Sequence, residues 1–532
     1  MASSSRSPKA GTTRRARGSA STKGTRGKSP TAARPPAKRQ RKTRGLPLLL
    51  VGLGVLAAAV AMAVWPDTPD PEVGPNATVN EGGPMSIVDA RNSPGIVRNP
   101  TDPDNLVVVH RIDRPMFGAE VHASHDGGAT WSVTEPPLPD ELDRPFAPDA
   151  AFAPDGTLYV TYVNLVGQGN TPDNVWITRS DDGGRTLQDP RPVAGELSFQ
   201  VRLAVGPAGE LYVTYVDATD VALLQLVGDA PLVAVRSDDA GETWSEPVQV
   251  SAAARPGGGA ATPAVDEDGD LVVLYQDFKD NVRDFQNLEG PPWEGPAALV
   301  LTRSSDGGET FQEGVEFESD MVPPGRFLVF LPEFPSLALA DGGRMAAAWS
   351  DARQGEEDVF VRRSDDGGRT WTDAAAVSDA PAAERLLPTV ALTPGGRVDV
   401  LYYERSAERA MDTMLAYSTD GGDSFRSLRV SSESFDPETG PDLAEHLGID
   451  FGTRIGLVSD DQSATGVWTD SRLAEDPDHA RQDIFAATVT LPDARAGARR
   501  LIAVGLLVMA PGCLLVAGVI LRRRRPRTRR RR

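Results

Sequence analysis

Cysteine is almost absent from this 532-residue chain, which contains only Cys513. A single cysteine excludes the disulfide framework that stabilises many small secreted domains. The length exceeds the roughly 250–300 residues at which single cores stop growing, so we expect several domains or one large repeat architecture. The 52 glycines and 44 prolines argue against a mostly helical protein.

Acidic residues are absent from both ends of the chain. Residues 1–45 contain 14 Lys and Arg, residues 522–532 contain 9 Arg, and neither segment has an Asp or Glu. The remaining 32 of the 55 basic residues stand against all 75 acidic ones, so the stretch between the ends has a net charge of −43. Because phosphate contacts need clustered Lys and Arg, this acidic body is not expected to bind nucleic acid.

Two uncharged apolar segments lie next to the basic ends. Residues 46–65 and 501–521 each match the ~20 residues that cross a ~30 Å hydrocarbon core as a helix. The positive-inside rule then places both basic, compositionally disordered tails in the cytoplasm and residues 66–500 outside. We therefore predict a cell-membrane protein with two spans and an extracytoplasmic domain. The alternative for the first segment is a signal peptide cleaved after Ala61-Met62-Ala63, which exports the same domain.

One octapeptide, typified by SDDGGRTW from Ser364, occurs six times in the predicted extracytoplasmic domain. We expect a hairpin turn in which the Asp carboxylate accepts backbone N–H groups and Gly supplies a positive φ. Six equivalent copies favour a structural role over a catalytic one. The third-position aspartates are Asp126, Asp182, Asp239, Asp306, Asp366 and Asp420.

A second repeated element is an apolar strand that ends in an aromatic residue, such as LYVTYV from Leu158. Seven copies can be aligned, and with the octapeptide they define units of four short strands between about residues 80 and 491. This pattern predicts an all-β fold, a β-propeller with seven blades favoured and six as the alternative. The last unit lacks an outer strand, which a strand within residues 76–90 could supply.

The acidic run Asp266 to Asp270 looks like a calcium loop in isolation, but it occupies the hairpin position of the other units and is interpreted as a turn. No cofactor is predicted, and Ca²⁺ is kept as an alternative for the acidic loops.

The octapeptide resembles the Asp box, or bacterial neuraminidase (BNR) repeat, of the sialidase superfamily, over roughly residues 80–491. This resemblance implies a propeller, and in sialidases three Arg bind the substrate carboxylate while a Tyr/Glu pair acts as nucleophile. Asn92 stands where the first Arg is expected. The remaining candidates are Arg385 and Arg454, near the starts of blades, and Tyr403 beside Glu404.

A set of polar residues stands two positions after the strand aromatics, at one predicted rim of the propeller. Repulsion among the carboxylates requires local Arg partners or a bridging cation, so the rim either forms ion pairs or binds Ca²⁺, a cationic ligand or a polyhydroxyl ligand. A long loop at the same face carries Trp293, a candidate for stacking on a sugar. The rim residues are Asn164, Asp217, Asp277, Asp351, Glu404 and Asp470.

The sequence thus predicts a membrane-anchored propeller that binds a carbohydrate or a surface protein. The alternatives are an exo-sialidase or other glycoside hydrolase of the same superfamily, and a scaffold of a membrane complex.

Overall fold

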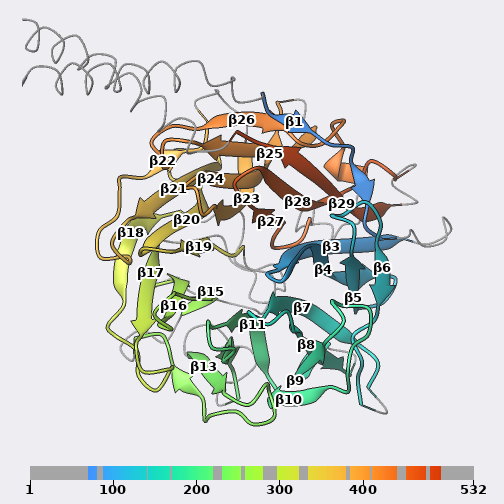
Figure 1. The fold of residues 1–532 in the computed structure, drawn as a ribbon, viewed down its shortest axis with the longest axis vertical. Helices are drawn as coiled ribbons and strands as arrows, with labels where there is room; N and C mark the ends of the chain where they lie inside the picture. Colours follow the sequence, from blue (N-terminus) through green and yellow to red (C-terminus); the bar gives the residue numbers. More distant parts are fainter. Residues whose placement is uncertain are drawn as a thin grey trace, which may run out of the picture. The chain divides into compact units, whose positions relative to one another are not determined.

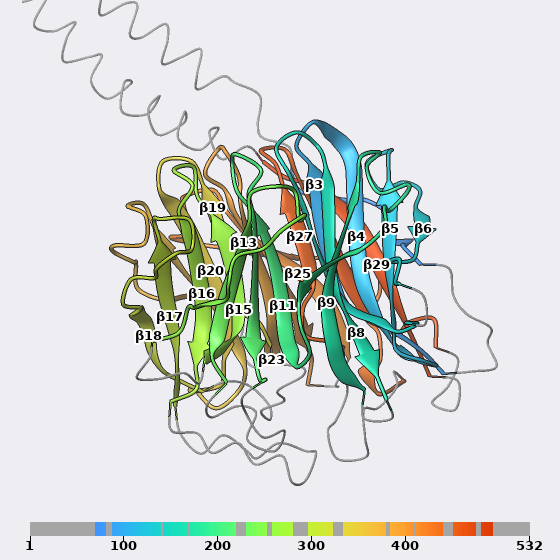
Figure 2. The same ribbon diagram turned by 90° about the horizontal axis from the view of Figure 1, so that it is seen from below.

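The structure, a computed structural model, describes residues 70–80, 88–139, 142–167, 170–219, 230–252, 258–279, 296–322, 333–378, 384–407, 410–439, 451–474 and 480–492. These residues form an all-β fold with one short 3-10 helix, η2 (Pro437–Thr439). The sheets lie around a common axis, as in a β-propeller (Figure 1). The strands run between the two faces of this ring (Figure 2).

Five sheets consist of four consecutive antiparallel strands, and we call each group a unit. Unit 2 contains β7 (Pro145–Phe152), β8 (Leu158–Val166), β9 (Thr171–Ser180) and β10 (Arg191–Ala194). Unit 3 contains β11 (Ser198–Val205), β12 (Leu211–Asp217), β13 (Leu232–Ser237) and β14 (Val248–Gln249). Unit 4 contains β15 (Gly258–Val265), β16 (Leu271–Asp277), β17 (Ala297–Ser304) and β18 (Val315–Met321). Unit 5 contains β19 (Ser336–Ala340), β20 (Arg344–Asp351), β21 (Asp358–Ser364) and β22 (Ala375–Ala376). Unit 6 contains β23 (Glu384–Leu392), β24 (Val398–Arg405), β25 (Met411–Ser418) and β26 (Arg426–Arg429).

The remaining sheet has nine strands and joins the two ends of the repeat. Unit 1 contains β3 (Asp89–Asn99), β4 (Asp102–Arg114), β5 (Gly118–Ser124) and β6 (Ser132–Thr134). Unit 7 contains β27 (Gly456–Ser459), β28 (Ser463–Asp470) and β29 (Arg481–Thr490), and β29 pairs in parallel with β3. β1 (Glu72–Val73) and β2 (Ala77–Thr78) pair with β29. An N-terminal strand therefore fills the outer position of unit 7, as predicted, although β1 begins earlier than the predicted range.

The hydrophobic core is divided into seven clusters, one between each pair of neighbouring units. The cluster between units 7 and 1 contains Val108, Val467, Ile484 and the N-terminal Val79. Because this last cluster is present, units 7 and 1 are joined by apolar contacts as well as by strand pairing. The strand aromatics are at most 3% exposed and lie in the other clusters, as their repetition predicted: Tyr162, Tyr215, Tyr275, Trp349, Tyr402 and Trp468.

The predicted octapeptide turn is present in all six copies, between the third and fourth strands of units 1 to 6. In unit 5, Oδ1 of Asp366 accepts the backbone N–H of Thr370 at 2.9 Å, and Oδ2 accepts its hydroxyl at 2.7 Å. The hydroxyl of Ser364 donates to the same carboxylate and accepts the N–H of Gly368. Gly367 and Gly368 have φ values of 75° and 81°, which only glycine adopts without strain. The acidic run at Asp266 likewise forms the β15–β16 turn.

No helix among the described residues is long and apolar enough to span a membrane. Both predicted spans, 46–65 and 501–521, lie outside the described residues, as do the two basic tails. The predicted membrane topology therefore stays a prediction.

Candidate functional site

The first strand of every unit places one residue at the same register position. Each of these residues pairs with the second-strand residue that precedes the aromatic position. All seven line a single cavity of about 180 Å³, which therefore lies on the axis of the ring. They are Gly95, Asp149, Arg202, Thr262, Ser336, Thr389 and Gly456.

A backbone bulge precedes this position in five units. The bulged residues have φ between 48° and 58°, in the left-handed region, so the strand is locally bent as it approaches the axis. Such bulges commonly re-aim neighbouring side chains near binding sites. The bulged residues are Ser93, Ala147, Gln200, Ala260 and Leu387.

The charged groups of the cavity come from three different units. Arg454 crosses the ring seam from unit 7: its Nη1 donates to Oδ1 of Asp149 at 3.0 Å, and its Nε donates to the carbonyl of Ser93 at 3.1 Å. Nε of Arg202 lies 3.4 Å from Oδ2 of Asp149. One carboxylate is thus shared by two guanidinium groups, and the described residues of the cavity lining have a net charge of +1.

The guanidinium of Arg202 can still donate hydrogen bonds to a ligand. Its Nη1 is buried and has no hydrogen-bond partner within the described parts of the chain, although 18% of the side chain is exposed. The guanidinium lies over the ring of Phe334, 5.1 Å from the centroid. A buried charged donor without an acceptor is costly, so this group is suited to receive an anionic acceptor from a ligand.

The electrostatic environment at Arg454 reflects this excess of positive charge. Burial is the main cause that lowers its pKa to about 10, and the neighbouring Arg202 and Arg111 add to the effect, while Asp149 opposes it. Arg111 itself is held by Asp113 and lies over Phe146. A local positive site is therefore embedded in a strongly acidic domain.

Four of the six predicted rim residues are the last residues of the second strands, and these four have the same local function. Each carboxylate accepts the backbone N–H two residues later, at 2.8–3.0 Å, and so caps the loop that follows. Arg353 and Arg472 also pair with the carboxylates that precede them. Binding of Ca²⁺ or a polyhydroxyl ligand by this rim stays a prediction. The four capping residues are Asp217, Asp277, Asp351 and Asp470.

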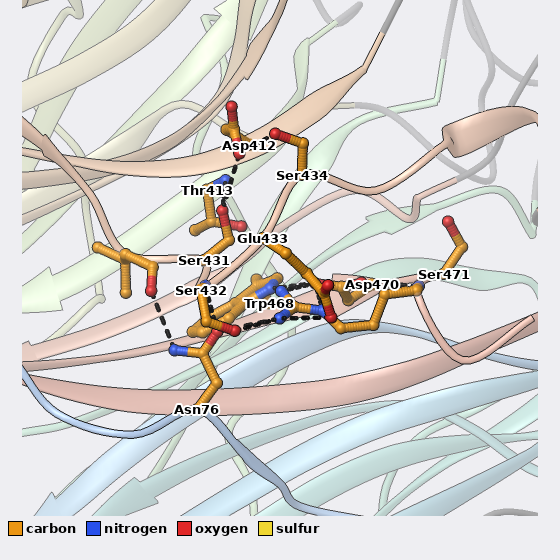
Figure 3. A network of polar contacts seen from close by, with 12 residues as sticks. Asn76, Asp412, Thr413, Ser431, Ser432, Glu433, Ser434, Trp468, Asp470 and Ser471 are labelled. Carbon is orange, nitrogen blue, oxygen red and sulfur yellow. Dashed lines mark hydrogen bonds and ion pairs between the residues drawn. The ribbon is translucent and has the colours of Figure 1, made fainter.

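Asp470 belongs to a larger network that ties the N-terminal segment to units 6 and 7 (Figure 3). Its Oδ2 accepts the indole N–H of Trp468 at 3.0 Å and Nε of Arg472 at 2.9 Å. Nη1 of Arg472 donates to the hydroxyl of Ser432 at 2.7 Å. The backbone N–H of Ser432 in turn donates to Oδ1 of Asn76 at 2.7 Å. This network gives Asp470 a structural role at the ring closure.

The remaining sequence candidates are not brought together at the axis. Arg385 donates to Glu404 at 2.9 Å and to Asp358 at 3.0 Å. Tyr403 is fully buried, and its hydroxyl donates to the carbonyl of Thr469 and accepts the N–H of that residue, both at 2.8 Å. A phenol used in this way is not placed to attack a substrate.

Trp293 lies outside the described residues. Asn164, another predicted rim residue, is buried, and its side-chain oxygen Oδ1 accepts the backbone N–H of Arg144 at 3.3 Å.

Sequence reasoning identified Arg454 but missed Asp149 and Arg202. A signal for Asp149 was present, because it follows Pro148 as Gly95, Ser336 and Thr389 follow their prolines. Arg202 lacks this proline, so its position became clear only from the strand register.

Comparison with known proteins gives distant structural similarity. A protein of unknown function from Dyadobacter fermentans is 13% identical, with a TM-score of 0.42 over 80% of this chain and 100% of its own. An ulvan lyase is 10% identical, with a TM-score of 0.45 over 75% of this chain and 94% of its own. The intramolecular trans-sialidase of Ruminococcus gnavus is 13% identical, with a TM-score of 0.42 over 61% of this chain and 92% of its own. No curated protein sequence is significantly similar to this chain. Residues 228–438 match the family described as a BNR repeat-like domain, which agrees with the repeat motif.

Proposed function

We propose that this protein is a glycan-binding propeller whose axial cavity receives the carboxylate of an acidic sugar. The observation that carries the proposal is the buried Nη1 of Arg202, which has no hydrogen-bond partner among the described residues and lies in a cavity whose described lining is net positive. A guanidinium binds a carboxylate through paired, charge-assisted hydrogen bonds, which give both affinity and orientation.

The other lining residues suit a sugar. Thr262, Ser336 and Thr389 place hydroxyl-bearing side chains around the axis, and Phe334 offers an apolar ring beside Arg202. The cavity of about 180 Å³ is smaller than the ~300–1,000 Å³ of sites that enclose drug-sized ligands. We therefore expect it to hold one terminal sugar or its acidic group rather than an internal stretch of polymer.

The proposal includes the architecture and location of the site. We take the seven units as seven blades, closed by β1 and β2, and residues 46–65 and 501–521 as membrane anchors with both termini in the cytoplasm. The sugar site is then presented outside the cell.

Calorimetric titration of the full-length chain, purified in detergent, tests this function. Glucuronate and N-acetylneuraminate should bind and glucose should not, since glucose lacks the carboxylate. Arg202→Gln should weaken binding at least about tenfold, because a hydrogen bond to a charged group contributes about 1.5–3 kcal/mol. Arg369→Gln, which changes an exposed Asp-box arginine, is the matched control. Equal binding of glucose, or unchanged binding by Arg202→Gln, would refute the proposal.

A glycoside hydrolase is the second candidate, and a pair of half-buried carboxyl groups, Glu333 and Glu357, favours it. Burial raises the pKa of Glu357 to about 8, and repulsion from Glu333 adds to the shift. Burial also raises the pKa of Glu333, which directly precedes the cavity residue Phe334. Glu357 is therefore protonated at neutral pH, as a general acid must be. Turnover of fluorogenic glycosides that falls above pH 8 and disappears in Glu357→Gln would support this candidate.

A further inference from the structure

A compact group of two histidines and one glutamate lies in unit 1, and none of the three is among the described residues that line the axial cavity. Nε2 of His110 is 3.0 Å from Nε2 of His122 and 3.2 Å from Oε2 of Glu120. Nε2 of His122 is 3.1 Å from the same Oε2. Three potential metal-ligating atoms therefore form a nearly equilateral triangle.

The group occupies the seam at which the ring closes. Val109 and Val121 face unit 2, whereas Val108, on the opposite face of β4, packs against Val467 and Ile484 of unit 7. Since side chains alternate along a strand, His110 and the β5 residues Glu120 and His122 share the face of Val108. His110 and His122 are 0% and 2% exposed, respectively.

His110 also departs from the repeat. It occupies the position that is a buried Tyr or Trp in units 2 to 7, where an aromatic ring fills the space between neighbouring units. A polar imidazole at this position needs partners, and it finds them in His122 and Glu120.

With both imidazoles neutral and Glu120 ionised, this triangle holds at most one proton, on Nε2 of His122, so the contact between His110 and Glu120 is not a hydrogen bond. Nδ1 of His110 lies 3.2 Å from the carbonyl of Arg111, which can only accept, so this nitrogen carries a proton. A neutral His110 then has a lone pair on Nε2, which faces the carboxylate of Glu120 at 3.2 Å. A cation between the three atoms removes this repulsion. The Nδ1 contact is also the usual way in which a protein orients a metal-binding histidine.

The dimensions fit a first-row transition metal. Tetrahedral Zn²⁺ with bonds of about 2.0–2.1 Å places its ligand atoms about 3.3 Å apart, close to the observed 3.0–3.2 Å. We propose that His110, Glu120 and His122 form a Zn²⁺ site that links β4 and β5 at the ring seam. Imidazole and carboxylate ligands favour Zn²⁺ and related ions over Ca²⁺, which prefers oxygen.

The surrounding charges permit a divalent cation. Arg91 approaches the same carboxylate oxygen, with Nε 3.4 Å from Oε2 of Glu120, and it is paired with Asp89. Two carboxylates and one guanidinium give the group a net charge of −1 when both imidazoles are neutral. A bound dication changes this net charge to +1. It supplies the positive charge that a buried imidazolium would otherwise have to provide beside Glu120. Both histidines are buried, and three protein ligands leave the fourth tetrahedral position to a water molecule.

Metal analysis of the full-length chain in detergent tests the site. The protein is stripped with EDTA, incubated with a small excess of Zn²⁺, freed of unbound metal by gel filtration and analysed by mass spectrometry. We expect one Zn²⁺ per chain in the wild type and in His125→Ala, whose histidine lies in an Asp box nearby. Glu120→Gln and His122→Ala should lose it, and Zn²⁺ should raise the melting temperature of only the first two proteins.

If a variant does not fold, the zinc content of the wild type still tests the proposed site. Failure of the wild type to retain Zn²⁺, or retention of one Zn²⁺ by folded Glu120→Gln and His122→Ala, would overturn the proposal. As an independent readout, Co²⁺ bound to the wild type should give the intense visible absorption of a tetrahedral site, and a weak octahedral spectrum would contradict the geometry.

Discussion

Asp149→Ala is the substitution that most directly probes how the axial cavity is held together. The Asp149 carboxylate accepts Nη1 of Arg454 at 3.0 Å and the backbone N–H of Leu203 at 2.9 Å, and it lies beside Nε of Arg202. Its removal leaves two guanidinium groups facing each other without a shared counter-charge.

The expected cost follows from these contacts. Removing one partner of a buried ion pair costs about 3–5 kcal/mol. Because the three side chains keep 11–18% exposure, we expect a loss of about 3 kcal/mol in the free energy of unfolding. Replacing Arg454 by Met in the same chain should restore part of this loss, since it removes one of the two opposed charges.

Denaturant unfolding followed by tryptophan fluorescence measures this loss as a shift of the midpoint at unchanged slope. Asp155→Ala is the matched control, because Asp155 is exposed and lies in the β7–β8 turn of the same unit, where it accepts one N–H from Thr157. It should cost less than about 1 kcal/mol. Equal costs for the two substitutions would refute the view that Asp149 is the counter-ion of the cavity.

Three further predictions concern the scaffold. Gly456→Ala should destabilise the protein by about 1–3 kcal/mol in the same unfolding assay, because an added Cβ would lie 2.7 Å from the backbone nitrogen of Ile96. Tyr403→Phe should cost about 1–3 kcal/mol, since the N–H of Thr469 loses its acceptor, but should leave sugar binding measured by calorimetry unchanged. Acid should lower the melting temperature between about pH 4 and pH 2. In that range four of the six Asp-box carboxylates become protonated in the folded state, because the hydroxyl of the box Thr is the chief cause that lowers their pKa to about 2: Asp126, Asp239, Asp306 and Asp366. Asp366→Asn should therefore reduce the pH dependence.

The repeated features of the fold could be predicted because each has a local cause. The Asp-box turn depends on residues within one octapeptide, as the bonds from Asp366 to Thr370 illustrate. The buried strand aromatics were recognisable from their repetition, and the outer strand of unit 7 from its absence in the last repeat. These are regularities that a single sequence displays.

The cavity depends on information that the sequence does not display. Arg202 reaches the axis because of strand register, and Asp149 pairs with Arg454 across 305 residues of chain. The rim carboxylates were noticed because they repeat, and the structure adds that four of them cap the loop that follows, as Asp217 does. Ligand binding by this rim stays a prediction. His110 stands at the position of the strand aromatic in the other units, and its partners on β5 follow from pairing in the sheet. Asp149, Arg202 and His110 do not belong to the repeat, so a search for repeated residues does not find them.

A crystal structure of the protein with glucuronate tests the central claim most directly. The account predicts the sugar in the axial cavity, with a carboxylate oxygen within hydrogen-bond distance of Nη1 of Arg202 and the Asp149–Arg454 pair intact. Glucuronate bound only at the rim carboxylates, or an axial cavity that stays free of ligand while the sugar binds elsewhere, would contradict it.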